Sequence, residues 1–275
     1  KGKLVHYVAP TVWAYKESRA KKFSKVYNHL LTILPFEAKY FEKENLPCTY
    51  VGNPVIEGNK EIKEIDLYKK FSLNHQNLIL CMMPGSRKGE IKKILPEFIK
   101  TAKILAARIS NLIVAIPTLE NLKPLVEEKL TKSKLKYIII TDEGDKINLY
   151  RQAKIGLIKS GTGALEASRY GLPIIIGYKI NIVTSFFIDM IVKVKYANLI
   201  NIILDRPVIC EFLNKNFIAE KMAKELYRIY SISELRDRQM KYVNKALKIM
   251  GLGSKDKPSK MAADKIIELL DKENI

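Results

Sequence analysis

Two short glycine-centred segments, each placed directly after an apolar run, constrain the fold of this chain most strongly. Residues 83–90 (MPGSRKGE) follow the apolar residues 78–82, and residues 159–166 (KSGTGALE) follow Ile155–Ile158. Both segments offer small residues, hydroxyls and backbone N–H groups where a strand is expected to meet a helix. In an open parallel sheet, ligands bind at this edge, and a helix N-terminus there favours an anion. The pair therefore predicts one phosphorylated ligand that is held from two sides.

Short apolar runs alternate with amphipathic ones along most of the chain. Several of the runs are rich in Ile and Val without alternation, as expected for strands that are covered on both faces. An apolar stripe that includes Phe98 and Leu105 predicts a helix beginning at Pro96, after a separate short turn at residues 90–93. This pattern predicts an α/β fold with a doubly wound parallel sheet. The predicted strands are residues 4–8, 48–51, 78–82, 112–116, 137–141, 155–158 and 174–177.

The last part of the chain has a different hydrophobic pattern. After Pro207 the pattern turns wholly helical, with amphipathic stretches at residues 217–230 and 235–250 and a final helix capped by Ser259. Gly52-Asn53-Pro54 marks a boundary after a predicted strand. We therefore expect residues 1–52 to be the tail of one domain and residues 53–250 a nearly complete second domain. Residues 251–275 are expected to be a linker and a final helix.

The charge of the chain indicates an anionic partner. Lys and Arg number 48 against 29 Asp and Glu, which gives a net charge of +19. Nucleic acid, an anionic membrane surface and phosphorylated substrates all fit this charge, and so does a solvated lysine-rich surface without a specific partner. The basic residues are spread along the chain, and no recognised nucleic-acid motif is present. We therefore predict no nucleic-acid partner.

The cysteines and histidines show no ligand spacing. Cys48, Cys81 and Cys210 are far apart in apolar surroundings, and the three histidines are scattered. This pattern predicts no metal site, no cofactor and no disulfide framework, and it suits a reducing cytoplasm. The sequence has no run of 18 apolar residues, so no membrane span is predicted.

The first glycine segment suits a diphosphate. Gly85, Ser86 and Arg87 place a flexible backbone, a hydroxyl and a guanidinium together. A guanidinium holds two phosphate oxygens at once and neutralises a nucleoside diphosphate leaving group. The alternative is an ordinary strand-to-helix turn with a surface arginine.

The second glycine segment has a similar character. The N–H groups of Ser160, Gly161 and Thr162 can receive a phosphate at a helix start, and Glu166, one turn inside, can accept the ribose hydroxyls. For Glu166 alone, a capping role is the favoured alternative. Asn201 lies in an apolar run, so its amide is either a structural contact or a ligand contact. Glu211 is predicted to be an acidic residue at the start of a helix.

Seven motifs together make a specific resemblance. They resemble motifs of the lipid-A-disaccharide synthase family and occur in that family's order and spacing, from residue 4 to about 250. Two positions depart from the family pattern: Asn53 stands where the family commonly has histidine, and Ile200 stands where it has proline. The motifs are residues 7–15 (YVAPTVWAY), 34–37 (LPFE), 51–54 (VGNP), 83–90 (MPGSRKGE), 160–166 (SGTGALE), 177–184 (GYKINIVT) and 196–213.

The resemblance implies a GT-B glycosyltransferase with two Rossmann-like domains, of which the N-terminal one is incomplete here. It also implies that the final helix, within residues 251–275, packs back toward the first domain. Such enzymes move 2,3-diacylglucosamine from UDP-2,3-diacylglucosamine to 2,3-diacylglucosamine 1-phosphate (lipid X), with inversion and release of UDP. They need no cofactor, and their lipid substrates place them at the cytoplasmic face of the bacterial inner membrane. By the resemblance, Asn201 and Glu211 match family positions at the UDP-binding cleft, and Arg87 and Asn201 contribute to catalysis. Glu166 is expected to bind the ribose. The residues expected to bind the UDP phosphates are Gly85, Ser86, Arg87, Ser160, Gly161 and Thr162.

The resemblance also carries expectations about the missing part of the first domain. The family's base lies upstream of this chain, so the chain alone is expected to keep donor binding better than catalysis. Two alternatives follow: an inactive UDP-sugar-binding remnant of the same family, and a UDP-sugar epimerase on the same fold. The scattered histidines speak against the epimerase. The sequence leaves the oligomeric state open, with a homodimer as one alternative.

Overall fold

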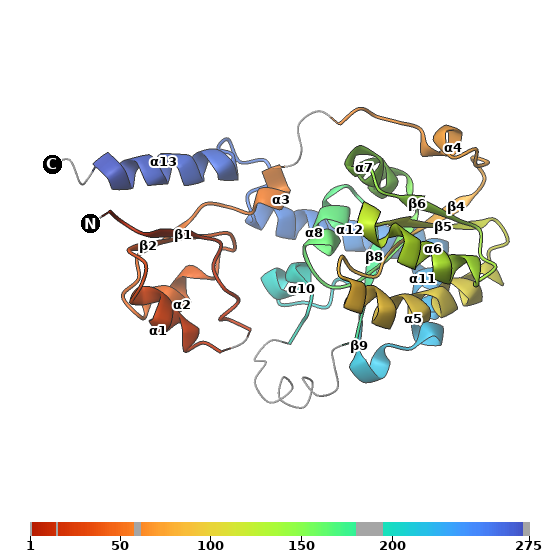
Figure 1. Ribbon diagram of the computed structural model, residues 1–275, viewed down its shortest axis with the longest axis horizontal. Helices are drawn as coiled ribbons and strands as arrows, with labels where there is room; N and C mark the ends of the chain where they lie inside the picture. Colours follow the sequence, from red (N-terminus) through yellow and green to blue (C-terminus); the bar gives the residue numbers. More distant parts are fainter. Residues whose placement is uncertain (1, 15, 58–61, 180–194, 272–275) are drawn as a thin grey trace. The chain divides into compact units, whose positions relative to one another are not determined.

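The computed structural model describes residues 2–14, 16–57, 62–179 and 195–271. Their contacts divide the chain into two compact units (Figure 1). Unit 1 contains residues 2–57 and 245–271, and unit 2 contains residues 62–179 and 196–244. The sequence-based domain boundaries at residues 52 and 250 stay predictions.

Unit 2 is built, over its described residues, on a six-stranded parallel sheet with the order β6-β5-β4-β7-β8-β9. Leu80 of β4 pairs with Val114 of β5 on one side and with Ile155 of β7 on the other. From β4 the chain adds β5 and β6 on one side of the sheet. It then crosses back to form β7 on the other side of β4, followed by β8 and β9. The α/β class with a doubly wound parallel sheet is confirmed. The strands are β4 Leu78–Met83, β5 Leu112–Pro117, β6 Tyr137–Ile140, β7 Ile155–Ile158, β8 Ile174–Tyr178 and β9 Glu211–Leu213.

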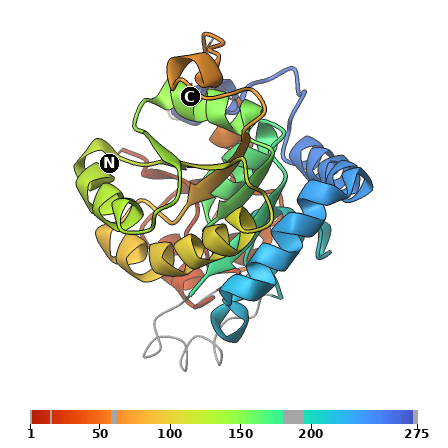
Figure 2. The same ribbon diagram turned by 90° about the vertical axis from the view of Figure 1, so that its right-hand side faces the viewer.

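Helices lie on both sides of this sheet (Figure 2). Side chains of α5, α6 and α11 share one buried core with Leu80 and Met82, whose side chains leave β4 on the same face. α7 contacts β4, and α8 contacts β8. The helices of unit 2 are α4 Leu67–Lys70, α5 Lys88–Ala106, α6 Lys123–Thr131, α7 Glu143–Gln152, α8 Thr162–Arg169, α10 Leu199–Leu204 and α11 Ala219–Ser231, with short 3₁₀ turns η1 Glu120–Leu122 and η2 Asn214–Asn216.

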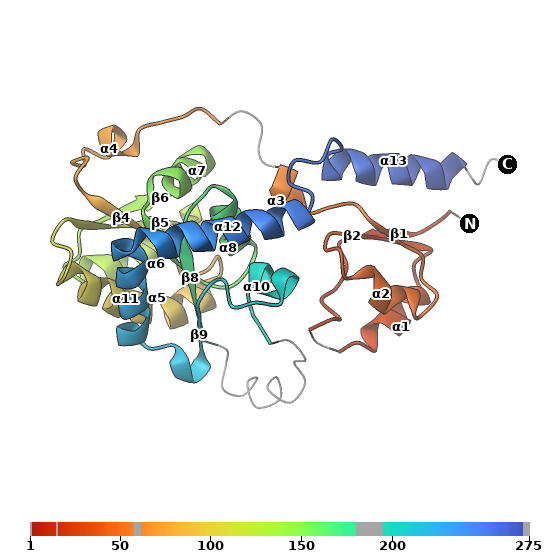
Figure 3. The ribbon, with the colours of Figure 1, turned by 180° about the vertical axis from the view of Figure 1, so that it is seen from behind.

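Helix α12, Ser233–Ile249, is a long helix that crosses the boundary between the units in the sequence, since residues up to 244 belong to unit 2 and later ones to unit 1 (Figure 3). In unit 2 it is tied to the sheet by Gln239. The Gln239 side chain accepts from the backbone N–H of Ile174 at 2.8 Å and donates to its carbonyl at 3.0 Å. A buried amide thus satisfies both backbone groups at the start of β8.

The prediction that the main helix begins at Pro96 is wrong. α5 is one helix from Lys88, and Pro96 lies inside it. A proline inside a helix removes one hydrogen bond and crowds the preceding turn. Here the apolar stripe continues unbroken across it, since Ile91, Ile94, Leu95 and Phe98 are all buried against the sheet. Burial of that face outweighs the loss of one bond.

Glu211 does not start a helix, so the prediction of a wholly helical chain after Pro207 is also wrong there. Glu211 begins β9, which pairs in parallel with β8 through Ile176 and Glu211. The next α-helix starts only at Ala219. Pairing with the open edge of β8 satisfies the backbone groups of this short segment.

Unit 1 has a three-stranded parallel sheet in its described residues, with the order β1-β2-β3. β2 was not among the predicted strands, because only two of its four residues are apolar and they stand between a histidine and a threonine. The unit's core gathers Leu30, Phe41 and Leu46 with smaller apolar residues. The elements are β1 Val5–Tyr7, β2 His29–Thr32, β3 Cys48–Tyr50, α1 Arg19–Ser24, α2 Ala38–Glu42, α3 Pro54–Glu57 and α13 Pro258–Asp271.

The C-terminal helix belongs to unit 1. The Tyr50 hydroxyl donates to the Met250 carbonyl at 2.9 Å. At the start of α13, Glu57 accepts from the Ser259 backbone N–H at 3.0 Å and from its hydroxyl at 2.6 Å. Ser259 was expected to cap this helix with its own oxygen. Instead it lies in the first turn and donates to a carboxylate from α3.

The Glu57–Ser259 contact predicts a pH-dependent contribution to stability. The hydrogen bond from the Ser259 hydroxyl is the main cause that lowers the pKa of Glu57. A lowered pKa means that the stabilisation is present above the unfolded value, about 4.3, and is lost as the pH falls through the folded value. Ser259→Ala is expected to cost about 0.5–1 kcal/mol at pH 7 and less below about pH 4. Thermal unfolding across this range, with Ser254→Ala as control, checks it; a difference that does not change with pH contradicts it.

The three cysteines carry free thiols. Burial raises the pKa of the Cys81 thiol in β4. Burial, with nearby glutamates, raises the pKa of Cys48 to about 12, and burial beside Glu225 raises that of Cys210 to about 12. All three are therefore thiols, not thiolates, at neutral pH.

Candidate functional site

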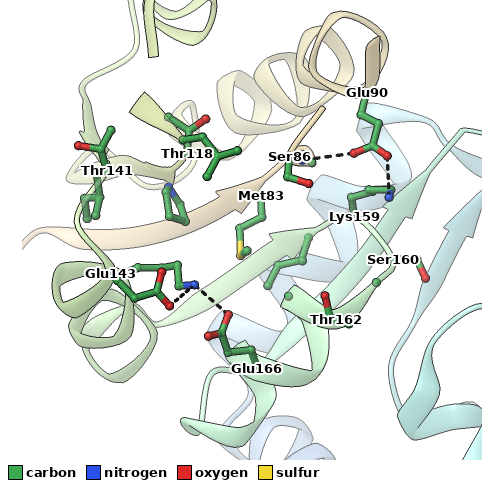
Figure 4. A pocket seen from close by; sticks show the side chains of 18 of the residues that line it. Met83, Ser86, Glu90, Thr118, Thr141, Glu143, Lys159, Ser160, Thr162 and Glu166 are labelled. Atoms are coloured by element: carbon green, nitrogen blue, oxygen red, sulfur yellow. Dashed lines mark hydrogen bonds and ion pairs between the residues drawn. The ribbon is translucent and has the colours of Figure 1, made fainter. Parts of the chain in front are cut away.

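A cavity of about 290 Å³ opens at the carboxyl ends of four neighbouring strands of unit 2 (Figure 4). Its lining comes from the residues that follow β4, β5, β6 and β7. β4 and β7 are adjacent, and the strand order reverses between them. This is the point of a doubly wound sheet at which ligands bind, because the loops on either side leave toward opposite helical layers.

The loop after β4 is shaped by Gly85 and closed by Glu90. Gly85 has a φ of +129°, and a Cβ there would meet the Glu90 side chain, so glycine is required. Glu90 is the third residue of α5, and its Oε2 accepts from the Ser86 backbone N–H at 3.2 Å. A glutamate at this position commonly reaches back to an unpaired N–H before the helix.

The loop after β7 is joined to the first one. The Lys159 backbone N–H donates to the Met83 carbonyl at 2.8 Å. The Lys159 ammonium lies 3.1 Å from Glu90 Oε1 and 5.1 Å from the centre of the Tyr178 ring. Gly161 follows with a φ of +149° as the N-cap of α8. One ion pair thus links the two glycine segments across the cavity.

Glu166 is held by two side chains of α7. Its Oε2 accepts from the Tyr150 hydroxyl at 3.2 Å and lies 3.1 Å from the Lys146 ammonium, which also pairs with Glu143 at 2.6 Å. Burial alone would lower the pKa of Lys146, but its bonds to Glu143 and Glu166 outweigh burial and raise it. Burial, with help from Cys81 and Glu166, raises the pKa of Tyr150. Lys146 is therefore charged and Tyr150 protonated, and both orient Glu166.

The structure brings six of the sequence-predicted site residues to this cavity: Gly85, Ser86, Ser160, Gly161, Thr162 and Glu166. Arg87 is not part of the lining. Its side chain is 83% exposed, and one guanidinium nitrogen lies 3.6 Å from Glu90 Oε1.

Asn201 and Glu211 lie away from the cavity lining and bind each other. Asn201 is fully buried; its amide nitrogen donates to Glu211 Oε1 and to the Ile209 carbonyl, both at 2.8 Å. Its oxygen accepts from the backbone N–H groups of Val208 and Ile209 at 2.9 Å. Of the two alternatives for Asn201, the geometry of the described residues supports the structural one.

Glu211 extends this network toward the second glycine loop. Its carboxylate accepts from the backbone N–H groups of Ala197 and Asn198 at 2.8 and 2.9 Å. The Ala197 carbonyl in turn accepts from the Ser160 hydroxyl at 2.7 Å. Asn201 and Glu211 thereby position the segment that holds Ser160.

Sequence reasoning missed several side chains of the cavity. Glu90, Asp142, Glu143, Lys146 and Lys159 are the charged ones, and Thr118 and Thr141 contribute hydroxyls. The Thr118 hydroxyl is buried and has no hydrogen-bond partner among the described residues. Only Glu90 had a usable signal, its place in the first turn of a helix. Residues 180–184 of the 177–184 motif lie outside the described residues, and with them Asn181, whose amide in an apolar run allowed the same two alternatives as that of Asn201. The described part of the chain shows no group of three His, Cys, Asp or Glu that could hold a metal ion.

The comparisons with known proteins agree with the motifs. A family model described as lipid-A-disaccharide synthetase matches residues 1–266. The chain belongs to the lipid-A-disaccharide synthetase family. Among curated members, the Rhodospirillum centenum synthase is 34% identical over 270 residues, covering 98% of this chain and 67% of the relative. The Rickettsia typhi synthase is 36% identical over 267 residues, covering 97% and 70%. The resemblance read from the sequence is confirmed, and with it the assignment to a glycosyltransferase family.

Solved structures show how widely the fold of this synthetase family is shared. A UDP-GlcNAc 2-epimerase from Neisseria meningitidis, bound to UDP-GlcNAc, matches with a TM-score of 0.58 at 13% identity, covering 82% of this chain and 61% of that one. A UDP-forming trehalose-phosphate synthase from Burkholderia xenovorans matches with a TM-score of 0.56 at 10% identity, covering 92% and 63%. At such identities the likeness shows the fold alone, so it does not favour the epimerase alternative over the synthetase family.

Proposed function

We propose that this chain provides the donor site of an inverting glycosyltransferase that makes lipid A disaccharide. The reaction moves 2,3-diacylglucosamine from UDP-2,3-diacylglucosamine to 2,3-diacylglucosamine 1-phosphate and releases UDP. The observation that carries the proposal is the cavity at the strand-order reversal, which is framed by both glycine segments in a member of this family.

The diphosphate of the donor fits between the two glycine loops. The first turns of α5 and α8 present backbone N–H groups there, and helix N-termini favour an anion. Ser86 and Thr162 add hydroxyls, and Arg87 and Lys159 add positive charge nearby. As the bond to the sugar breaks, negative charge grows on the diphosphate, so these donors stabilise the leaving group.

Glu166 is the proposed ribose contact. Lys146 and Tyr150 both hold Oε2, which fixes the direction of the carboxylate in the cavity lining. A carboxylate held in this way accepts hydrogen bonds from two vicinal hydroxyls without first having to be ordered.

The lipid substrates place the reaction at a membrane. A net charge of +19 favours the anionic cytoplasmic leaflet of the inner membrane, where a peripheral enzyme would meet both acylated sugars. None of the helices among the described residues is long and apolar enough to cross a bilayer.

Arg87→Ala tests the donor site. If Arg87 contacts the diphosphate in the complex, the variant is expected to weaken UDP binding by about 1.5–3 kcal/mol, the size of a charge-assisted contact. Calorimetry with UDP measures this, with Lys132→Ala as the control, since Lys132 is an exposed cation just after α6. Unchanged affinity in Arg87→Ala would remove Arg87 from the site. Absence of UDP binding by the unmutated chain would contradict the donor-site proposal as a whole.

A further inference from the structure

The carboxylate of Glu90 occupies the contacts that a phosphate would need. Its Oε2 accepts from the Ser86 backbone N–H at 3.2 Å, and its Oε1 lies 3.1 Å from the Lys159 ammonium (Figure 4). The same Oε1 lies 3.6 Å from the Arg87 guanidinium. A backbone N–H, an ammonium and a guanidinium that converge on paired oxygens form the donor set with which proteins bind phosphate. A side chain of α5 thus lies where a bound phosphate would make these contacts.

The charge of the cavity requires an exchange of partners before a diphosphate binds. The lining holds four carboxylates and two ammonium groups; they are Glu90, Asp142, Glu143, Glu166, Lys146 and Lys159. Lys146 is shared by Glu143 and Glu166, and Lys159 is paired with Glu90. An added anion would meet uncompensated negative charge in a partly desolvated site.

Lys159 is the better placed of the two cations near Glu90. Its side chain is 21% exposed, whereas that of Arg87 is 83% exposed. A partly buried charge is screened less by water and salt, so its contact with an anion is stronger. Its ammonium also lies over the Tyr178 ring, which keeps the side chain at the edge of the cavity after its partner leaves.

We infer that Lys159 is a diphosphate-binding residue and that Glu90 is its exchangeable partner, an internal competitor of the donor's phosphates. On donor binding, the Ser86 N–H and the Lys159 ammonium pass from the Glu90 carboxylate to phosphate oxygens, and the Glu90 side chain turns away. When UDP leaves, the carboxylate takes these donors back, which favours product release. The inference deepens the proposed function and rests on it.

The test is calorimetry of the full chain with UDP and, separately, with inorganic pyrophosphate. Glu90→Gln keeps the shape of the side chain and removes its charge, so UDP is expected to bind about three- to tenfold more tightly. Lys159→Met is expected to bind UDP about tenfold more weakly or worse. In the double variant the gain from Glu90→Gln should shrink, because the two residues act through one contact. Pyrophosphate should follow the same order, since these contacts belong to the diphosphate and not to the base.

Glu128→Gln and Lys132→Met are the matched controls. These residues form an exposed ion pair of the same kind, at 2.8 Å, at the C-terminal end of α6. Neither change should alter UDP affinity. Glu90→Asp, which shortens the reach of the carboxylate by one methylene, is the second variant if Glu90→Gln does not fold, and it too should bind UDP more tightly.

Two outcomes overturn the inference in different ways. If folded Glu90→Gln binds UDP no more tightly than the unmutated chain, or if Lys159→Met binds it equally well, Glu90 and Lys159 are structural partners only, and the proposed donor site stands without them. If the unmutated chain and all variants bind neither UDP nor pyrophosphate, the donor site itself fails and the inference fails with it.

Discussion

Asn201→Ala is expected to lower the free energy of unfolding by about 2–4 kcal/mol, because several buried polar groups lose their partner at once. The Asn201 amide satisfies the N–H groups of Val208 and Ile209, the Ile209 carbonyl and one oxygen of Glu211. Water cannot replace it readily, since the side chain is fully buried. Such a loss is a large fraction of the stability of a typical domain.

Denaturant unfolding at neutral pH measures this effect, with Asn216→Ala in the exposed turn before α11 as the control. A second readout separates structure from chemistry. If Asn201 positions the Ala197–Ser160 contact, Asn201→Ala loses stability and UDP affinity together. A variant that kept its stability and UDP affinity but lost the transfer rate would instead assign Asn201 to the reacting atoms, as the family resemblance implies.

Glu166→Gln is expected to weaken UDP binding by about 10- to 100-fold, because it replaces a charge-assisted acceptor of two hydroxyls with a neutral amide. The effect should depend on the ribose. The unmutated chain should prefer UDP to its 2′,3′-dideoxy analogue by a similar factor, and in Glu166→Gln this preference should nearly vanish.

Calorimetry with the two nucleotides gives the four affinities needed. Glu143→Gln is the matched control, because Glu143 is the other partner of Lys146 but does not bind Tyr150. Glu143→Gln should keep the preference for the ribose hydroxyls. If Glu166→Gln still prefers UDP to the dideoxy analogue by the original factor, Glu166 is a structural partner of Lys146 and the ribose contact lies elsewhere.

The sheet of unit 2 was predictable because its inner strands are continuous apolar runs. β4, β5 and β7 are buried on both faces and read directly from the sequence. β9 is an edge strand of three residues, and its identity depends on the partner strand β8 rather than on its own residues. Helix α5 shows the same dependence, since tertiary burial carries it through Pro96.

The backbone of the site was predictable and its charge pattern was not. Gly85 and Gly161 are local signals of loops with unusual backbone angles, and both loops line the cavity. The Glu90–Lys159 pair joins residues 69 positions apart in the chain. No local sequence pattern predicts such a pair, because it forms only when β4 and β7 become neighbours. The hydrogen bond between Asn201 of α10 and Glu211 of β9 was also not predictable, because the helix and the strand meet only in the folded chain.

The distribution of the thiols gives this protein built-in reporters of local opening. Cys48 lies in unit 1, and Cys81 and Cys210 lie in unit 2. Cys81 is buried, Cys48 and Cys210 are half-buried, and the pKa of each thiol is raised in the folded chain, so an alkylating reagent at neutral pH reacts faster with each of them once its surroundings have opened. Timed alkylation followed by peptide mass spectrometry therefore reads the opening of each unit separately, in one sample and without an added label. Within unit 2, Cys81 reports the opening of the central strand β4, and Cys210 reports the opening of the segment before the edge strand β9.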